Sequence, residues 1–127
     1  MDGQNELTQE KQLFQKGMQA FNGRRFYAAH EYWEELWLEH KLEDANFIQG
    51  LIQLAVSYFH LFNQNLKGAR SMIRKCLGKF EGFDKARGMD VDELKIQIKE
   101  VQEHFNKIDN TTEYLDSYIL TLKVIHE

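Results

Sequence analysis

A histidine and a glutamate stand four residues apart in a run that is rich in aromatic and acidic residues. On a helix such residues lie on the same face, so His30 and Glu34 are placed to contact each other. The pair lies at the edge of an apolar face that contains Trp33 and Trp37. An imidazole and a carboxylate held there could act as an acid–base pair or as metal ligands. A boundary histidine satisfied by Glu34 explains the same spacing without any chemistry.

The segment over residues 44–62 is apolar around most of its circumference, which indicates a central, buried helix. The polar residues in and just after it fall within about 80° of one another on a helical projection. They are Asn46, Gln49, Gln53, Ser57, His60 and Gln64. Two interpretations stay open: the stripe faces solvent, or it faces the His30–Glu34 edge and lines a polar pocket with it.

The pocket interpretation defines a set of candidate site residues. The candidates for acid–base chemistry, such as hydrolysis, are His30, Glu31, Glu34 and His60. The candidates for contact with a small ligand are Gln49, Gln53, Trp33 and Trp37. A divalent metal is the candidate cofactor, with His30, Glu34 and His60 as its ligands. The common motifs do not match, since Glu34 stands where the metalloprotease pattern needs a histidine and no histidine follows a glutamate by three residues.

The elements that must position these residues are helices, because apolar residues recur at three- and four-residue spacing along almost the whole chain. We expect helices over residues 8–21, 26–40, 44–62 and 66–80, the last fraying through Gly78, Gly82 and Gly88. A fifth helix begins after Asp90, which forms a capping-box pattern with Glu93. The apolar residues 118–125 fit either a last helical turn or an extended strip, and we expect a segment packed across the bundle.

A weak internal repeat relates two of the turns at a shift of 40 residues. The corresponding triplets are Gly23, Phe26 and Ala29, and Asn63, Leu66 and Ala69. A turn followed by a large and then a small residue is similar to the helix hairpins of tetratricopeptide repeats. Two hairpins are too few for a solenoid, so the prediction is an all-α, compact bundle of about five helices arranged as helix hairpins. A protein–protein interaction scaffold without catalytic activity is the alternative function.

Composition narrows the class of protein. The chain has 127 residues, no proline, one cysteine and a net charge of −4. The lone Cys76 cannot form an internal disulfide, which favours a reducing, cytoplasmic location. The polar N-terminus is unlike a signal peptide, and no apolar run is long enough to span a membrane.

Charge is unevenly distributed between two of the predicted helices. The basic residues of the fourth helix are Lys67, Arg70, Arg74, Lys75 and Lys79. No aromatic residues are interleaved with them, so nucleic acid is a disfavoured partner. We expect the basic residues to form a solvated face that complements the acidic second helix. Three kinds of partner remain possible interpretations: a small molecule, a partner protein, and a second copy of the chain in a homodimer formed through the apolar tail.

Three segments of the chain carry a family signature. They contain Phe21-Asn22, Phe26, Ala29-His30-Glu31, Glu34 and Trp37; then Gln49-Gly50-Leu51-Ile52-Gln53-Leu54-Ala55; then His60, Asn65 and Gly68-Ala69. With this spacing the chain resembles the domain-of-unknown-function 309 (DUF309) family from about residue 21 to 69. The resemblance implies a small all-helical protein and no known activity. From the length of the chain we expect a single domain over 1–127, with a family-like core at about 8–83 and a C-terminal helix and tail at 90–127.

The chain departs from the family pattern at the turns and at two other positions. The first turn glycine of the family would fall at Arg24, whereas this chain has Gly23, so we expect this turn to be remodelled. Gln64 replaces the glycine of the second hairpin. Phe26 stands where a tyrosine is usual, and Asn46 where a basic residue is common. The signature nevertheless falls on the histidines, glutamates and glutamines that the helical projection selects.

Overall fold

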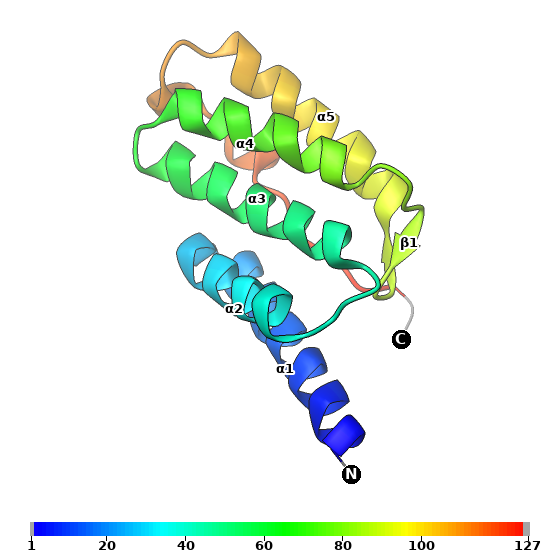
Figure 1. Cartoon of the computed structure of the whole chain (residues 1–127). Helices are drawn as coiled ribbons and strands as arrows, with labels where there is room; N and C mark the ends of the chain where they lie inside the picture. Colours follow the sequence, from blue (N-terminus) through cyan, green and yellow to red (C-terminus); the bar gives the residue numbers. More distant parts are fainter. Residues whose placement is uncertain (1, 126–127) are drawn as a thin grey trace.

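Five α-helices make up most of the computed structural model, which describes residues 2–125 and their side chains from residue 8 onward. The helices are α1 (Asp2–Asn22), α2 (Phe26–Glu39), α3 (Ala45–Phe62), α4 (Leu66–Lys79) and α5 (Val91–Lys107). Each helix packs on the next one in the chain, so α3 lies between α2 and α4 (Figure 1). The prediction of a compact all-α bundle is therefore confirmed. No described helix has the length and apolarity needed to cross a membrane.

The two short strands between α4 and α5 were not predicted. Strand β1 (Lys85–Ala86) pairs antiparallel with β2 (Met89–Asp90). Arg87 and Gly88 form the two-residue turn, with φ of 48° and 78°. Positive φ at both positions is typical of a type I′ turn, whose twist matches that of a hairpin. Asp90 then begins α5, because its side chain accepts a hydrogen bond from the Glu93 amide at 3.0 Å, as the capping pattern predicts.

The repeat at a shift of 40 residues is visible in the backbone of the two turns. Arg24 and Gln64 both adopt left-handed conformations, with φ of 61° and 60°. The amide of Arg25 donates to the carbonyl of Ala20, and that of Asn65 donates to the carbonyl of His60, at 2.8 and 2.9 Å. These bonds close the C-termini of α1 and α3 in the same manner. Arg24 and Gln64 are the positions at which the resemblance places the turn glycines of the family.

Replacing Gln64 with glycine should stabilise the protein. A non-glycine residue in the left-handed region is strained by its Cβ, and glycine removes this strain. Glycine also has greater freedom in the unfolded chain, which opposes the gain. We expect a net increase of about 1 kcal/mol in the free energy of unfolding. The free energy of unfolding in urea measures the gain. Gln64→Ala keeps the Cβ and should leave that free energy unchanged. A glycine variant no more stable than the alanine variant would contradict the expectation.

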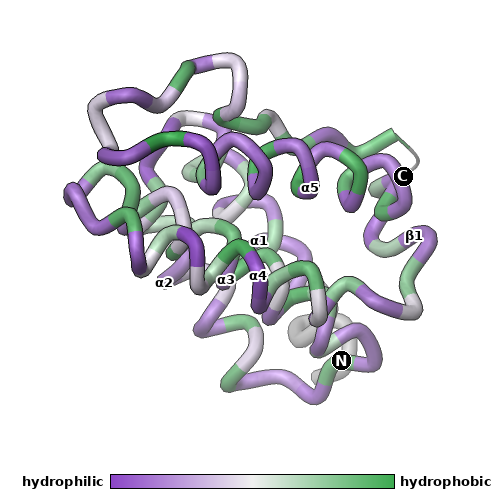
Figure 2. Tube along the Cα trace, turned by 90° about the horizontal axis from the view of Figure 1, so that it is seen from above, coloured by the Kyte–Doolittle hydropathy of each residue, from purple (hydrophilic) through white to green (hydrophobic). Residues whose placement is uncertain are grey.

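The core lies along α3, whose buried side chains contact both neighbouring helices. Figure 2 shows the alternation of hydrophobic and hydrophilic residues along α5 that turns one face of that helix inward. Gly50 allows the close crossing that its mid-helix position predicts, because a Cβ there would lie 2.6 Å from the Phe80 ring. Gly17 has the same role between α1 and α2, where a Cβ would lie 2.0 Å from Nε1 of Trp33. Trp33 is fully buried, and its Nε1 donates to the Phe14 carbonyl at 3.2 Å.

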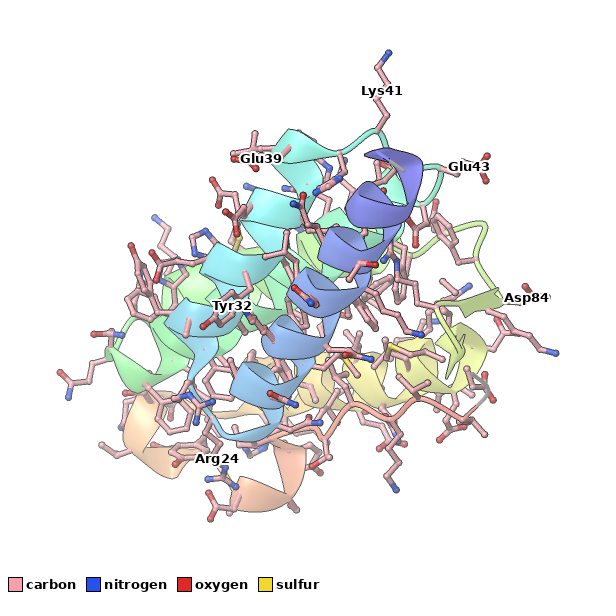
Figure 3. The ribbon with its side chains drawn as sticks, turned by 90° about the horizontal axis from the view of Figure 1, so that it is seen from below. Arg24, Tyr32, Glu39, Lys41, Glu43 and Asp84 are labelled. Atoms are coloured by element: carbon pink, nitrogen blue, oxygen red, sulfur yellow. The ribbon has the colours of Figure 1, made fainter. Side chains whose placement is uncertain are left out.

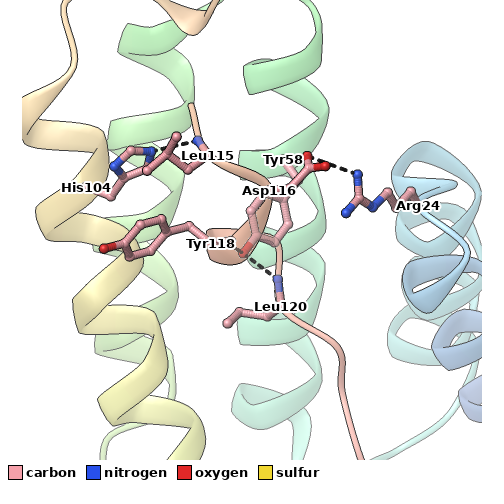
Figure 4. Close-up of polar contacts among 7 residues, drawn as sticks. All are labelled: Arg24, Tyr58, His104, Leu115, Asp116, Tyr118 and Leu120. Atoms are coloured by element: carbon pink, nitrogen blue, oxygen red, sulfur yellow. Dashed lines mark hydrogen bonds and ion pairs between the residues drawn. The ribbon is translucent and has the colours of Figure 1, made fainter. Parts of the chain in front are cut away.

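The C-terminal segment crosses the bundle, as the sequence predicts. It contains two short 3-10 helices, η1 (Thr111–Glu113) and η2 (Asp116–Tyr118), followed by an extended strip. The Tyr58 hydroxyl donates to the Tyr118 carbonyl at 2.6 Å. It also accepts from the Leu120 amide at 3.1 Å (Figure 4). The side chain of Asn22 forms two hydrogen bonds with the backbone of Leu122.

A buried histidine on α5 fixes the beginning of this segment. His104 Nε2 accepts the backbone amide of Leu115 at 3.0 Å, and its ring stacks on Tyr118 with centroids 4.2 Å apart. Burial of the ring lowers the pKa of His104, and the nearby Lys107 adds to the effect. The neutral form is the one that can accept this hydrogen bond. Arg24 and Asp116 form an exposed ion pair across the same region (Figure 4).

Candidate functional site

The outer side of α2 is a shallow, open depression that contains three of the four predicted acid–base residues. The inner side of this helix is anchored in the core by Phe26, Ala29, Trp33 and Leu36, so the remaining residues point outward. The depression is lined by Tyr27, Ala28, His30, Glu31, Tyr32, Glu34, Glu35, Leu38 and Glu39, which we call the α2 face.

His30 and Glu34 contact each other at the edge of this face, as the four-residue spacing predicts. His30 Nε2 lies 2.5 Å from Glu34 Oε2, and the two side chains are 23% and 46% exposed. The other ring nitrogen, Nδ1, is buried and has no hydrogen-bond partner within the described chain. The Tyr27 ring lies beside the imidazole, with centroids 5.5 Å apart.

The remaining carboxylates of the α2 face are exposed and lack basic partners. Within the part of the chain that the structure describes, no lysine or arginine forms an ion pair with Glu31, Glu35 or Glu39. The basic α4 lies on the far side of α3, so the predicted charge complementarity is not realised as contact within one chain. Figure 3 shows Glu39 at the end of α2, projecting away from the ribbon.

Four hydrophobic side chains of α2 are exposed to solvent. The exposed fractions are 54% for Tyr27, 36% for Tyr32, 40% for Trp37 and 65% for Leu38. Three of them belong to the α2 face. The ring of Tyr32 also lies 5.9 Å from the Lys16 ammonium, which is within reach of a cation–π contact.

His60 lies apart from the α2 face, at the turn between α3 and α4. The Asn65 Oδ1 atom accepts the Gly68 amide at 2.9 Å, which fixes the orientation of the Asn65 side-chain amide. Its Nδ2 therefore donates to His60 Nδ1, at 3.3 Å. A chain of ring contacts runs from His30 through Tyr27 and Phe59 to His60. His60 is thus bonded within its own turn.

The polar stripe of α3 divides among several environments. Asn46 is exposed, whereas Gln49 and Gln53 are half-buried. Ser57 is fully buried and donates to the Ala69 carbonyl of α4 at 2.7 Å, so this part of the stripe faces α4. Oε1 of Gln53 is buried without a hydrogen-bond partner in the described structure.

The three candidate metal ligands do not come together as a set. Among the described side chains, those of residues 8–125, no group of three or more His, Cys, Asp and Glu is arranged to hold a metal ion. His30 and Glu34 form a pair, and His60 is bonded to Asn65. Cys76 is buried on α4, where its Sγ donates to the Ile73 carbonyl, and burial raises its pKa.

Sequence reasoning missed a second polar cluster, which joins the hairpin to the loop between α2 and α3. Arg87 binds both carboxylate oxygens of Asp44, at 2.7 and 3.1 Å. Glu10 of α1 lies 3.9 Å from the Arg87 guanidinium and 3.7 Å from Nδ1 of the buried His40 side chain. The guanidinium also covers the Phe14 ring. The members of this cluster come from three separate segments (α1, the loop between α2 and α3, and the hairpin), so no local spacing could have revealed it.

The comparison with protein families covers the segment that contains the α2 face. Residues 14–72 match the model of the domain of unknown function DUF309. The chain carries a DUF309 segment. This segment runs from the middle of α1 into α4 and includes both similar turns, so the resemblance inferred from the three sequence segments is confirmed.

One relative with a curated sequence extends the comparison beyond the DUF309 segment. A stretch of 97 residues is 27% identical to an uncharacterized protein of Aquifex aeolicus (strain VF5). The match covers 75% of this chain and 29% of the relative, so the chain spans less than a third of that protein's length. No solved structure matches the chain.

Proposed function

We propose that this protein is a protein-binding domain and that the α2 face is its docking surface. The observation that carries the proposal is the combination, on one helix side, of exposed Tyr27 and Leu38 with carboxylates that lack basic partners. Tyrosines and other large apolar side chains are typical of the centre of protein interfaces. Polar residues around an exposed apolar patch are typical of interaction sites.

The shape of the α2 face supports a polypeptide partner over a small molecule. Pockets for small ligands are concave and bury most of the ligand surface. The α2 face is open, and every residue that lines it comes from a single helix. A second polypeptide can cover such a surface and exclude water from it by its own bulk.

A small-ligand site between α2 and α3 is the second candidate function. It is supported by the two buried atoms without partners, His30 Nδ1 and Gln53 Oε1, which lie on adjacent helices. Buried polar atoms usually have partners, and a ligand with a donor and an acceptor could supply them. An acid–base role for His30, Glu31, Glu34 and His60 belongs to this second candidate.

Photo-crosslinking in cells distinguishes the two candidates. We expect p-benzoylphenylalanine at position 27 or 38 to form covalent adducts with another polypeptide. The same residue at position 96 or 115 should not do so, although Ile96 and Leu115 are 53% and 55% exposed, as Tyr27 is at 54%. These two positions are the matched controls for exposure.

The remaining outcomes overturn the protein-binding proposal. Adducts formed equally at all four positions would show contact without a defined docking surface. An absence of adducts at 27 and 38, with a bound small molecule detected by native mass spectrometry and lost in the His30→Ala variant, would favour the second candidate. An absence of both would contradict the two candidates together.

A further inference from the structure

We infer that the segment bound by the α2 face is a basic amphipathic helix of about three turns with an apolar residue near each end. This inference rests on the proposed function and specifies its partner. It combines three observations: the order of side chains along the α2 face, the missing basic partners and the exposed apolar residues.

The order of residues on the α2 face sets the length of the partner. Tyr27, Glu31, Glu34 and Leu38 fall within about 60° of one another on a helical projection, so they form one stripe along the helix. The apolar members, Tyr27 and Leu38, stand at the two ends, and the carboxylates lie between them. The two ends are eleven positions apart, which corresponds to about 17 Å along the helix axis.

The carboxylates determine the charge of the partner. Glu31 and Glu35 are exposed and have no ion pair with a described lysine or arginine. Within the described structure, the Glu34 carboxylate pairs with the His30 imidazole alone. A partner that excludes water from these groups must supply opposite charge, because an uncompensated buried carboxylate is strongly destabilising. The middle of the partner segment therefore carries lysine or arginine.

The spacing of the apolar ends favours a helix over an extended strand. In a helix, residues separated by eleven positions return to the same face, and the positions four and seven residues along lie between them. An extended chain covers about 17 Å in roughly five residues. Residues five apart point to opposite faces of a strand, so a strand cannot present both apolar ends at this distance.

A second copy of this chain is the less suitable occupant. Its basic helix α4 offers exposed Lys67, Arg74 and Lys75. None of the large hydrophobic residues that are exposed in the described structure lies on α4, so this helix has no apolar ends for Tyr27 and Leu38. Arg70 is also unavailable, because it binds the carbonyls of Phe105 and Ile108 at the end of α5. The occupant is therefore a segment of another protein.

Designed peptides of about 16 residues test the inference. The first is an alanine-rich helix with leucines eleven positions apart and arginines at the fourth, seventh and eighth positions after the first leucine. The second has the same composition with the leucines five positions apart. The third has glutamate in place of arginine. Fluorescence anisotropy with the full chain measures the three affinities at low and moderate salt.

We expect the first peptide to bind about tenfold more tightly than the second and to lose affinity as salt rises, with no binding of the third. The variant Glu31→Lys should weaken the first peptide about tenfold, because it places like charges opposite each other. Glu103→Lys, at an exposed position of α5, is the matched control and should leave the affinity unchanged.

Four results overturn the inference. Equal binding of the first two peptides, or equal loss in both protein variants, would show charge attraction without the inferred spacing. Failure of all peptides, with adducts still formed at positions 27 and 38, would leave the protein-binding function in place and reject the basic helix as partner. Self-association in sedimentation that is abolished by Glu31→Lys would identify a second copy as the occupant.

Discussion

Replacing Gly17 with alanine should destabilise the protein by about 3 kcal/mol, the upper end of the range for an overfilled core. The added Cβ would lie 2.0 Å from Nε1 and 2.4 Å from Cδ1 of Trp33, far inside van der Waals contact. The tryptophan cannot rotate away without loss, because its ring is fully buried and its Nε1 binds the Phe14 carbonyl. Either α1 and α2 must separate or this hydrogen bond must break. Urea unfolding monitored by tryptophan fluorescence measures the loss.

Gly78 provides the matched control for this substitution. It also lies in a helix, but no atom beyond its own helix backbone and its neighbours comes within 4 Å of an added Cβ. Gly78→Ala should therefore stabilise α4, by about 0.5 kcal/mol from helix propensity alone. Opposite signs for the two variants would confirm that the contact with Trp33 decides the result. A Gly17→Ala protein as stable as the natural one would show that α1 and α2 are not packed in this way.

The helices could be predicted from the sequence because their determinants are local. Apolar spacing, the capping residue Asp90 and the turns after residues 22 and 62 all act within a few residues of one another. The close packing at Gly50 also has a local signal, because glycine inside a helix is costly and its presence there indicates a close helix crossing. The β-hairpin was missed because its sequence signal is only the pair Arg87-Gly88, which lacks the asparagine or aspartate most typical of such turns.

Residues whose partners are distant in sequence were harder to interpret. The fourth helix was predicted as a solvated basic face, yet Arg70 is half-buried and donates to two carbonyls at the C-terminus of α5. Arg87 likewise forms its ion pairs with Asp44 and Glu10 only in the folded chain, because both partners are distant in sequence. A guanidinium has the same sequence signal whether it faces water or binds a carbonyl 35 residues away. Helical periodicity cannot separate these cases.

The candidate site shows the same division between local and distant determinants. The contact between His30 and Glu34 was predictable because both residues lie on one helix, four positions apart. Whether His60 would join them depended on how α2 and α3 cross, and its ring instead accepts a hydrogen bond from Asn65. The exposure of Tyr27 and Leu38 was not predicted either, since the partly apolar circumference of α2 permits several choices of buried face.

Removing one hydroxyl should loosen the C-terminal segment and destabilise the whole chain. The substitution Tyr58→Phe deletes the group that binds both the Tyr118 carbonyl and the Leu120 amide. Both backbone groups then lose their partner, and because Tyr58 is fully buried, water cannot fully replace it. We expect the free energy of unfolding to fall by about 2 kcal/mol. The burial that raises the pKa of Tyr58 keeps the hydroxyl protonated, so it can donate over the whole neutral range.

Hydrogen exchange separates a loosened tail from a general loss of stability. In Tyr58→Phe we expect the exchange of the Leu120 amide to accelerate more than the exchange of amides in the middle of α3. The Leu120 amide has lost its acceptor, whereas the helix keeps its own hydrogen bonds. Tyr32→Phe is the control, since the Tyr32 hydroxyl has no hydrogen-bond partner among the described residues, and its free energy of unfolding should stay unchanged. Uniform acceleration at every amide would instead show that the segment opens only with the whole bundle. Unchanged exchange at Leu120 would show that Asn22 and His104 suffice to hold the segment, since they bind the backbone of Leu122 and Leu115 on either side of it.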